Sequence, residues 1–152
     1  MKKISALLFV CCFCVLSLYG CSSNSMELYL DDSPYTANQV EIDITAMTQK
    51  NYGTDTYRLS LNFTITNHNP DISSYYFEGG EIVREKDGAK YAIGSLPCSH
   101  YVAFAVGCDV QTTRDGQATI PTSLEDDKYM FTYTYEGTKF TIHLYNSNNW
   151  FS

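Results

Sequence analysis

The chain has 152 residues and a formal charge of −7 at neutral pH, with 13 tyrosines, 8 phenylalanines and one tryptophan. A chain of this length forms one domain of ordinary size and can bury a substantial core. Its acidic balance repels phosphate backbones and anionic lipid head groups, which excludes nucleic acid as a partner.

The first residues predict an export signal. Lys2 and Lys3 give a positively charged start, residues 4–18 form an apolar run without Asp or Glu, and Cys21 precedes a polar stretch. The run is shorter than the ~20 apolar residues that cross a bilayer, so a membrane-spanning helix is the weaker interpretation. An ordinary signal peptide, cut and released, is the stronger competing interpretation.

The end of this segment, Leu18-Tyr19-Gly20-Cys21, resembles the lipid-attachment signal of bacterial lipoproteins. The resemblance implies loss of residues 1–20, diacylation of Cys21, a lipidated tether over residues 21–25 and a folded domain over residues 26–152. Two acyl chains give lasting anchorage, so we expect an extracytoplasmic protein at the cell membrane or the outer membrane. Two lysines leave with the leader, which changes the charge from −7 to −9.

From residue 26 onward the sequence predicts short β-strands separated by turn residues. Residues 57–67 give the clearest strand, because one parity is apolar and the other polar. Asp87-Gly88 predicts a two-residue hairpin turn, and residues 136–138 predict another between the last two strands. Arg114-Asp115-Gly116 is predicted to be a further turn.

Seven or eight short strands, turns about every 10 residues and no long segment of helical period predict an all-β antiparallel sandwich. The strand over residues 59–67, the Asp87-Gly88 hairpin, Arg114-Asp115-Gly116-Gln117 and the arm over residues 131–137 resemble immunoglobulin-like lipoprotein domains of bacterial cell envelopes that have no assigned function. The resemblance covers residues 27–145. It implies an immunoglobulin-like, envelope-anchored binding or adaptor module.

Cys98 and Cys108 are the cysteines that remain after the leader and Cys21. The Cα atoms of bridged cysteines lie about 4.4 to 6.8 Å apart, whereas ten residues of extended strand span roughly 33 Å. A disulfide therefore requires the chain to reverse between them, and the sequence leaves the pairing open. Two thiols are too few for the four ligands of a structural zinc, and we expect neither a metal nor a cofactor.

No nucleophile motif such as Gly-x-Ser-x-Gly is present, so we expect a protein that is not an enzyme. His143 lies on the polar parity of its strand, which predicts a solvated histidine. The acidic clusters Asp31-Asp32 and residues 125–127 lack the spacing of a calcium loop and are interpreted as solvated turns.

Aromatic residues are the candidate ligand contacts. Twelve tyrosines follow Cys21, more than we expect a core of this size to hold with every hydroxyl satisfied. Tyr75, Tyr76 and Trp150 are therefore predicted to stack on a glycan or anchor an envelope protein, although tyrosines also cover half-exposed strand faces. The alternative function is an acidic inhibitor of a cationic enzyme such as a lysozyme, with residues 125–127 as its acidic loop.

Overall fold

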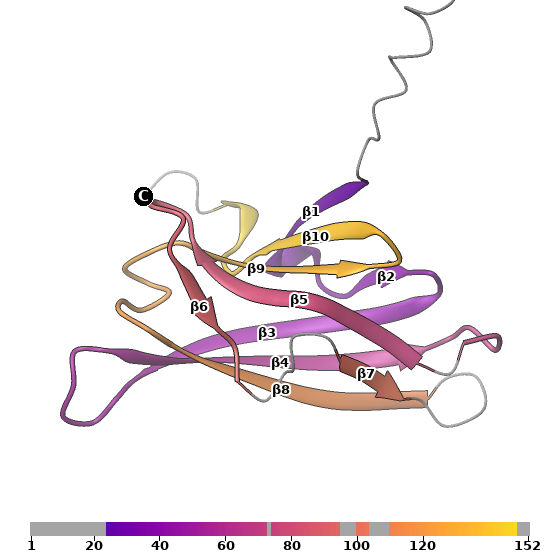
Figure 1. Cartoon of the computed structure of the whole chain (residues 1–152), viewed down its shortest axis with the longest axis horizontal. Helices are drawn as coiled ribbons and strands as arrows, with labels where there is room; N and C mark the ends of the chain where they lie inside the picture. The colour runs from indigo at the N-terminus through magenta and orange to yellow at the C-terminus, as the bar shows by residue number, and fades with distance from the viewer. Residues whose placement is uncertain (1–23, 73, 95–99, 104–109, 149–152) are drawn as a thin grey trace, which may run out of the picture.

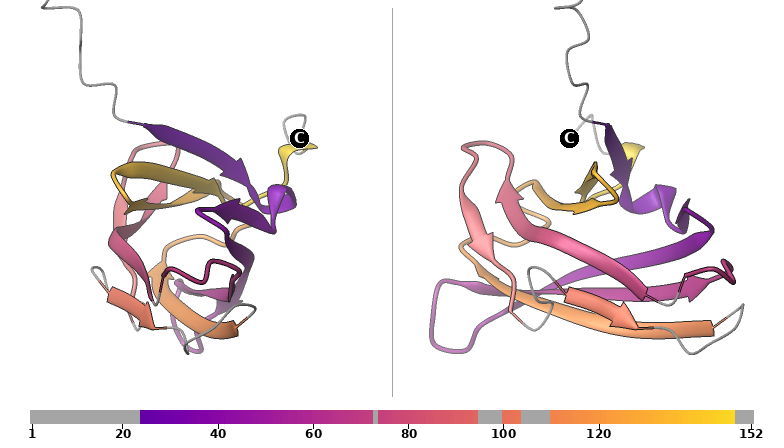
Figure 2. Two further views of the ribbon diagram at one scale, coloured as in Figure 1. Left: turned by 90° about the vertical axis from the view of Figure 1, so that its right-hand side faces the viewer. Right: turned by 45° about the vertical axis from the view of Figure 1, so that its right-hand side comes forward.

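The structure, a computed structural model, describes residues 24–72, 74–94, 100–103 and 110–148. Within these residues the chain forms ten β-strands, one short 3-10 helix and no α-helix. The strands lie in two sheets that pack face to face, as Figure 1 and Figure 2 show. The predicted all-β sandwich is confirmed, with more strands than the expected seven or eight.

The first sheet has the order β1-β10-β9-β5-β6, with β7 also paired to β5, and the second has the order β2-β3-β4-β8. The strands of the first sheet are β1 (Ser25–Tyr29), β5 (Ser74–Arg84), β6 (Lys90–Ala92), β7 (His100–Ala103), β9 (Tyr129–Tyr135) and β10 (Thr138–His143). Those of the second are β2 (Tyr35–Ala37), β3 (Val40–Lys50), β4 (Tyr57–Asn67) and β8 (Val110–Ile120), and helix η1 (Leu30–Asp32) joins β1 to β2.

This strand order is that of an immunoglobulin-like sandwich. β3, β4 and β8 are neighbours in the same order as strands A, B and E of that fold, and β5, β9 and β10 in the order of strands C, F and G. β6 extends the first sheet where strand C′ does in variable-type domains. β1 adds a parallel strand to β10, with Tyr29 opposite His143.

Aromatic rings fill the centre of the sandwich. In antibody domains a disulfide joins strands B and F and packs against a tryptophan on strand C. Here Phe63 of β4 and Phe131 of β9 meet edge to face with ring centroids 5.5 Å apart, and Phe77 of β5 lies 5.7 Å from Phe63. All three rings are buried. Apolar contacts on the same three strands therefore join the two sheets.

The crossover from β8 to β9 carries a tyrosine corner. Tyr129 is the first residue of β9. Its hydroxyl donates a hydrogen bond to the Thr122 carbonyl at 3.3 Å, and the hydroxyl oxygen lies 2.5 Å from Thr122 Oγ1. A tyrosine at the start of strand F that bonds upstream backbone is typical of immunoglobulin-like domains. The strand pattern alone did not predict this corner, although a tyrosine two residues before Phe131 was an available signal.

The prediction that Tyr75 contacts a ligand is wrong, because this side chain is fully buried. Its ring stacks on Tyr135 with centroids 3.9 Å apart, and its hydroxyl lies 3.0 Å from the hydroxyl of Tyr133. Tyr133 also hydrogen-bonds Tyr35 from the opposite sheet. The core holds more tyrosines than expected because their hydroxyls satisfy one another.

The predicted turn at Arg114-Asp115-Gly116 is also wrong. These residues lie inside β8, where Asp115 is opposite Asn62 and Gly116 is opposite Leu61. All 11 residues of β8 are in register with β4. Long-range strand pairing here outweighs a local turn preference. By contrast, β4 has the predicted bounds, and hairpins form at Asp87-Gly88 and at Glu136-Gly137 as predicted. The first has a longer turn than the predicted two residues, since the Arg84 amide donates to the Ala89 carbonyl at 2.8 Å.

Cys21, Cys98, Cys108 and Trp150 lie outside the described residues, so lipidation, disulfide formation and a ligand contact at Trp150 stay predictions. Tyr76 is half-buried on β5. The part of the chain that the structure describes contains no helix of a length and hydropathy that would cross a membrane.

Candidate binding site

One half of strand β3 has an open outer edge. Pairing between β2 and β3 ends at Ile42, opposite Tyr35, and the next outward amide, that of Ile44, donates to Ser33 Oγ at 2.8 Å. Alternate residues of a strand direct their backbone groups to the same edge, so Ala46 and Thr48 come next. Within residues 24–72, 74–94, 100–103 and 110–148, no strand pairs with this part of β3.

A groove of about 450 Å³ runs along this open edge, and we call it the lateral groove. Its volume is within the range of ligand sites in proteins. Its floor is apolar, since Leu144 is buried and Leu30 and Leu124 are half-buried. The residues that line the groove are Leu30, Ala46, Met47, Thr48, Leu124, Glu125, Leu144, Tyr145 and Asn146.

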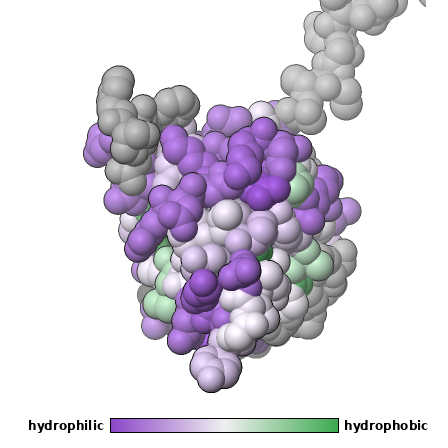
Figure 3. Space-filling model, turned by 90° about the vertical axis from the view of Figure 1, so that its left-hand side faces the viewer, coloured by the Kyte–Doolittle hydropathy of each residue, from purple (hydrophilic) through white to green (hydrophobic). Residues whose placement is uncertain are grey.

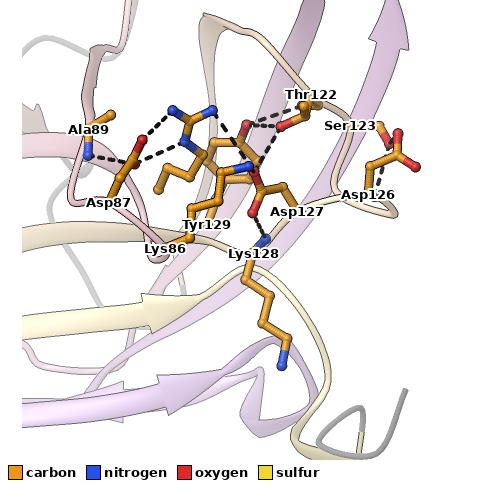
Figure 4. Close-up of polar contacts among 10 residues, drawn as sticks. Lys86, Asp87, Ala89, Thr122, Ser123, Asp126, Asp127, Lys128 and Tyr129 are labelled. Carbon is orange, nitrogen blue, oxygen red and sulfur yellow. Dashed lines mark hydrogen bonds and ion pairs between the residues drawn. The ribbon is translucent and has the colours of Figure 1, made fainter.

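Partly buried polar contacts hold the loop between β8 and β9, which supplies Leu124 and Glu125. The Asp127 carboxylate is only 8% exposed and accepts hydrogen bonds from Lys86 Nζ and from Thr122 Oγ1, the latter at 3.3 Å. Figure 4 shows Lys86 and Asp127 pointing toward one another. Ser123 Oγ donates to Asp126 Oδ2 at 2.6 Å. These contacts restrain the loop, and its residues Leu124 and Glu125 line the lateral groove.

Asp127 is ionised, which strengthens its contacts with Lys86 and Thr122. Burial alone would raise the pKa of Asp127, but the hydrogen bond from Lys86 and the backbone amide of Lys128 lower it below its ordinary value. Beside it, Arg84 donates two hydrogen bonds to Asp87 and lowers the pKa of that carboxyl to about 2. Both carboxylates are therefore ionised at neutral pH.

Helix η1 forms another wall of the groove and is tied to the chain after β10. The Leu30 amide donates to the Tyr145 carbonyl at 3.3 Å. The Asp31 carboxylate accepts the amide of Ser147 at 2.9 Å and its hydroxyl at 2.7 Å. These hydrogen bonds from Ser147 lower the pKa of Asp31. These hydrogen bonds join the two segments that contain Leu30 and Asn146, and both residues line the groove.

Tyr145 is oriented by a polar cluster on the outer face of the first sheet. Its hydroxyl donates to Glu85 Oε1 at 2.9 Å, and Glu85 Oε1 lies 2.6 Å from His143 Nδ1. The ring of Tyr29 stacks on His143 with centroids 4.6 Å apart. The prediction of a solvated His143 is wrong, since its side chain is 12% exposed. β1 pairs with β10, and Tyr29 of β1 covers His143. The alternation of polar and apolar residues along β10 could not reveal this.

Acidic residues lie in or beside two of the segments that line the lateral groove. The two acidic clusters predicted as separate solvated turns lie in segments that line it, and four of their carboxylates are exposed: Asp31, Asp32, Glu125 and Asp126. Lys128 lies with its ammonium 4.9 Å from the centroid of the Tyr145 ring. Among the described residues, no group of three or more His, Cys, Asp or Glu side chains is placed to hold a metal ion.

The β3–β4 hairpin projects at one end of the sandwich (Figure 1). Tyr52 in its turn is fully exposed. Figure 3 shows this end of the molecule to be mostly hydrophilic, with small, separate hydrophobic areas. The face in that view therefore offers no broad apolar platform.

The fold defines the class of this protein as an immunoglobulin-like β-sandwich, on the strand order given above. No protein-family model matches the sequence, and no curated protein is significantly similar to it. Two solved structures match the chain. One is Northeast Structural Genomics Consortium target SoR45, at 13% identity over 78% of this chain and 95% of that one, with a TM-score of 0.42. The other is an uncharacterized β-sandwich protein from Clostridium difficile 630, at 12% identity over 80% and 96%, with a TM-score of 0.40.

Proposed function

We propose that this protein is an extracytoplasmic lipoprotein, anchored through Cys21 to the cell membrane or the outer membrane, that acts as a binding or adaptor module of the cell envelope and not as an enzyme. The lipid-attachment pattern at Leu18-Tyr19-Gly20-Cys21 supports the anchor. The resemblance to immunoglobulin-like envelope lipoproteins is consistent with the strand order of the sandwich.

The observation that carries the proposal is the lateral groove beside an open strand edge. Its walls are held by polar contacts that are already formed, as described for Asp127 and Asp31. A preformed surface binds without a large ordering cost. The groove combines apolar side chains at its floor with polar side chains and backbone groups along its walls, which suits recognition of a partner.

Short chain length between the anchor and the body adds support. β1 begins at Ser25, four residues after Cys21. Four residues span at most roughly 14 Å when extended. An anchored Cys21 would therefore hold the sandwich close to the membrane, where it meets envelope proteins or glycans.

Fractionation of cells that express the full chain tests the anchor. We expect the natural protein in the membrane fraction with a mass increase for two acyl chains at Cys21, and we expect Cys21→Ala to be soluble. Retention of the alanine variant in the membrane fraction would contradict anchoring at Cys21. Crosslinking of the anchored protein in its own envelope, followed by mass spectrometry, then tests for a bound protein or glycan.

The acidic inhibitor remains a second candidate because the mature chain would carry a charge of −9. Its expected loop is restrained, since Asp126 and Asp127 bind Ser123 and Lys86, and of its three acids Glu125 and Asp126 are exposed while Asp127 is not. Capture of a basic enzyme that loses activity in the complex would favour this candidate, whereas an adaptor leaves enzymatic activity unchanged.

A further inference from the structure

We propose that the lateral groove binds an extended segment of a partner protein, in which small apolar residues alternate with basic ones, as an additional strand beside β3. This inference deepens the proposed binding function by naming the class of partner. It does not require the lipid anchor, so the two proposals fail separately.

The backbone of β3 supplies the first argument. Ala46 and Thr48 present their N–H and C=O groups at the open edge, two residues apart, which is a spacing of about 6.7 Å along a strand. An incoming strand repeats its backbone groups at the same interval. An α-helix uses its own backbone groups internally and cannot pair in this way.

The place of β2 supplies the second argument. β2 already pairs with the other half of this same edge, from Val40 to Ile42, and Ser33 Oγ accepts the amide of Ile44. A strand beside Ala46 and Thr48 would thus continue along an edge that already accepts a strand of this chain. The main-chain geometry for pairing exists before the partner arrives.

The floor of the lateral groove determines the apolar half of the pattern. Side chains of an added strand alternate between the groove and the outer face of the second sheet. Those that point inward meet Leu30, Leu124 and Leu144. A groove of about 450 Å³ accommodates small apolar side chains such as valine or alanine.

Charge determines the other half of the pattern. The exposed carboxylates of Asp31, Asp32, Glu125 and Asp126 belong to segments that line the groove or adjoin its lining residues. Basic side chains on the alternate positions of the partner complement this charge, and they speed encounter with a protein whose net charge is negative.

The probe is a short blocked peptide of alternating lysine and valine, titrated into the purified full-length protein. We expect saturable binding with slowed hydrogen exchange at the Ala46 and Thr48 amides. If the peptide adds antiparallel to β3, as β2 does, its valine nitrogens face β3. Their methylation then removes the main-chain donors of the pairing and should weaken binding about tenfold or more. A peptide of alternating glutamate and valine should not bind.

Variants separate strand pairing from simple charge attraction. Ala46→Pro deletes an edge donor at a position where a strand tolerates proline, and should weaken binding about tenfold. Glu125→Lys should weaken it as well, while Asp115→Lys, the same charge change on the outer face of β8, should leave it unchanged. If Ala46→Pro fails to fold, the methylated peptide still tests strand pairing. The comparison of Glu125→Lys with Asp115→Lys still tests whether the charge acts at the groove.

Several outcomes would overturn the proposal. Binding that depends on salt but not on Ala46→Pro or peptide methylation would mean charge attraction alone, and no binding would exclude this class of partner. Protection of the Ala46 and Thr48 amides in the free protein would mean that this chain itself occupies the edge. Protection that rises with protein concentration would mean a second copy of the chain.

Discussion

The two halves of strand β3 differ in what covers their outer edge. From Val40 to Ile42 the edge is paired with β2, and the side chains of Val40 and Ile42 are fully buried. From Ala46 to Thr48 the edge borders the lateral groove, and the adjacent Met47 is 60% exposed. One strand therefore contributes both to the core and to a candidate binding site.

This difference arises from a short β2. β2 has three residues and β3 has 11, so most of the outer edge of β3 extends past its partner. Native proteins usually cover or shorten such an edge, because unpaired backbone groups recruit other strands. Here the neighbouring walls are fixed by Asp127 and Asp31, which favours a specific binding surface over an unprotected edge.

The largest expected effect comes from the covered half. Ile42→Ala should lower the free energy of unfolding by about 2 to 5 kcal/mol, because it empties a fully buried position. Met47→Ala, in the open half, should change it by less than about 0.5 kcal/mol. Urea unfolding of both variants measures the contrast, and equal effects would contradict the burial of Ile42 in the core.

The loop that lines the groove should depend on the tyrosine corner. Tyr129→Phe removes the hydrogen bonds to Thr122 and should cost about 1 to 2 kcal/mol. Tyr52→Phe, at a fully exposed tyrosine, is the matched control and should be neutral. Thermal unfolding detects the difference. A neutral Tyr129→Phe would show that the loop is held without the corner.

Ser33 marks the boundary between the two halves. Ser33→Ala removes the acceptor of the Ile44 amide and should cost about 1 kcal/mol. It should also extend the open edge toward Ile42, because the Ile44 amide becomes available to solvent. Hydrogen exchange resolved by residue should then be faster at Ile44 than in the natural protein, and an unchanged rate would place the boundary elsewhere.

Acid should weaken the groove wall held by Asp127. Its pKa lies below the ordinary value of 3.8 in the folded protein, so its contribution to stability is present above that value and is lost as the pH falls through the lowered pKa. Asp127→Asn should therefore be less stable at neutral pH and lose less stability on acidification below about pH 4. Unfolding midpoints measured across this pH range show how the stability of each variant depends on pH. Asp55→Asn, at an exposed ion pair, is the control.

Local patterns predicted the regular part of the fold. β4 alternates apolar and polar residues over its whole length, and the Asp87-Gly88 and Glu136-Gly137 turns carry a left-handed glycine. Patterns failed where distant chain segments decide the outcome. Gly116 pairs with Leu61 despite its turn-like neighbours, and Tyr75 is buried because Tyr133 satisfies its hydroxyl.

The lateral groove could not be predicted from the sequence. Leu30, Leu124 and Leu144 are far apart in the chain and give no shared motif. They come to lie beside one open edge because the two sheets pack together and because β2 begins only at Tyr35, which leaves the rest of β3 unpaired on that side. The acidic clusters were recognisable as clusters, but their common position required the fold.

Hydrogen exchange of the free protein tests the division of β3 most directly. The account predicts strong protection of the Ile42 and Ile44 amides, whose acceptors are the β2 backbone and Ser33 Oγ, and rapid exchange of the Ala46 and Thr48 amides. Equal protection at all four amides in dilute solution would contradict it, because the edge proposed to receive a partner would already be covered.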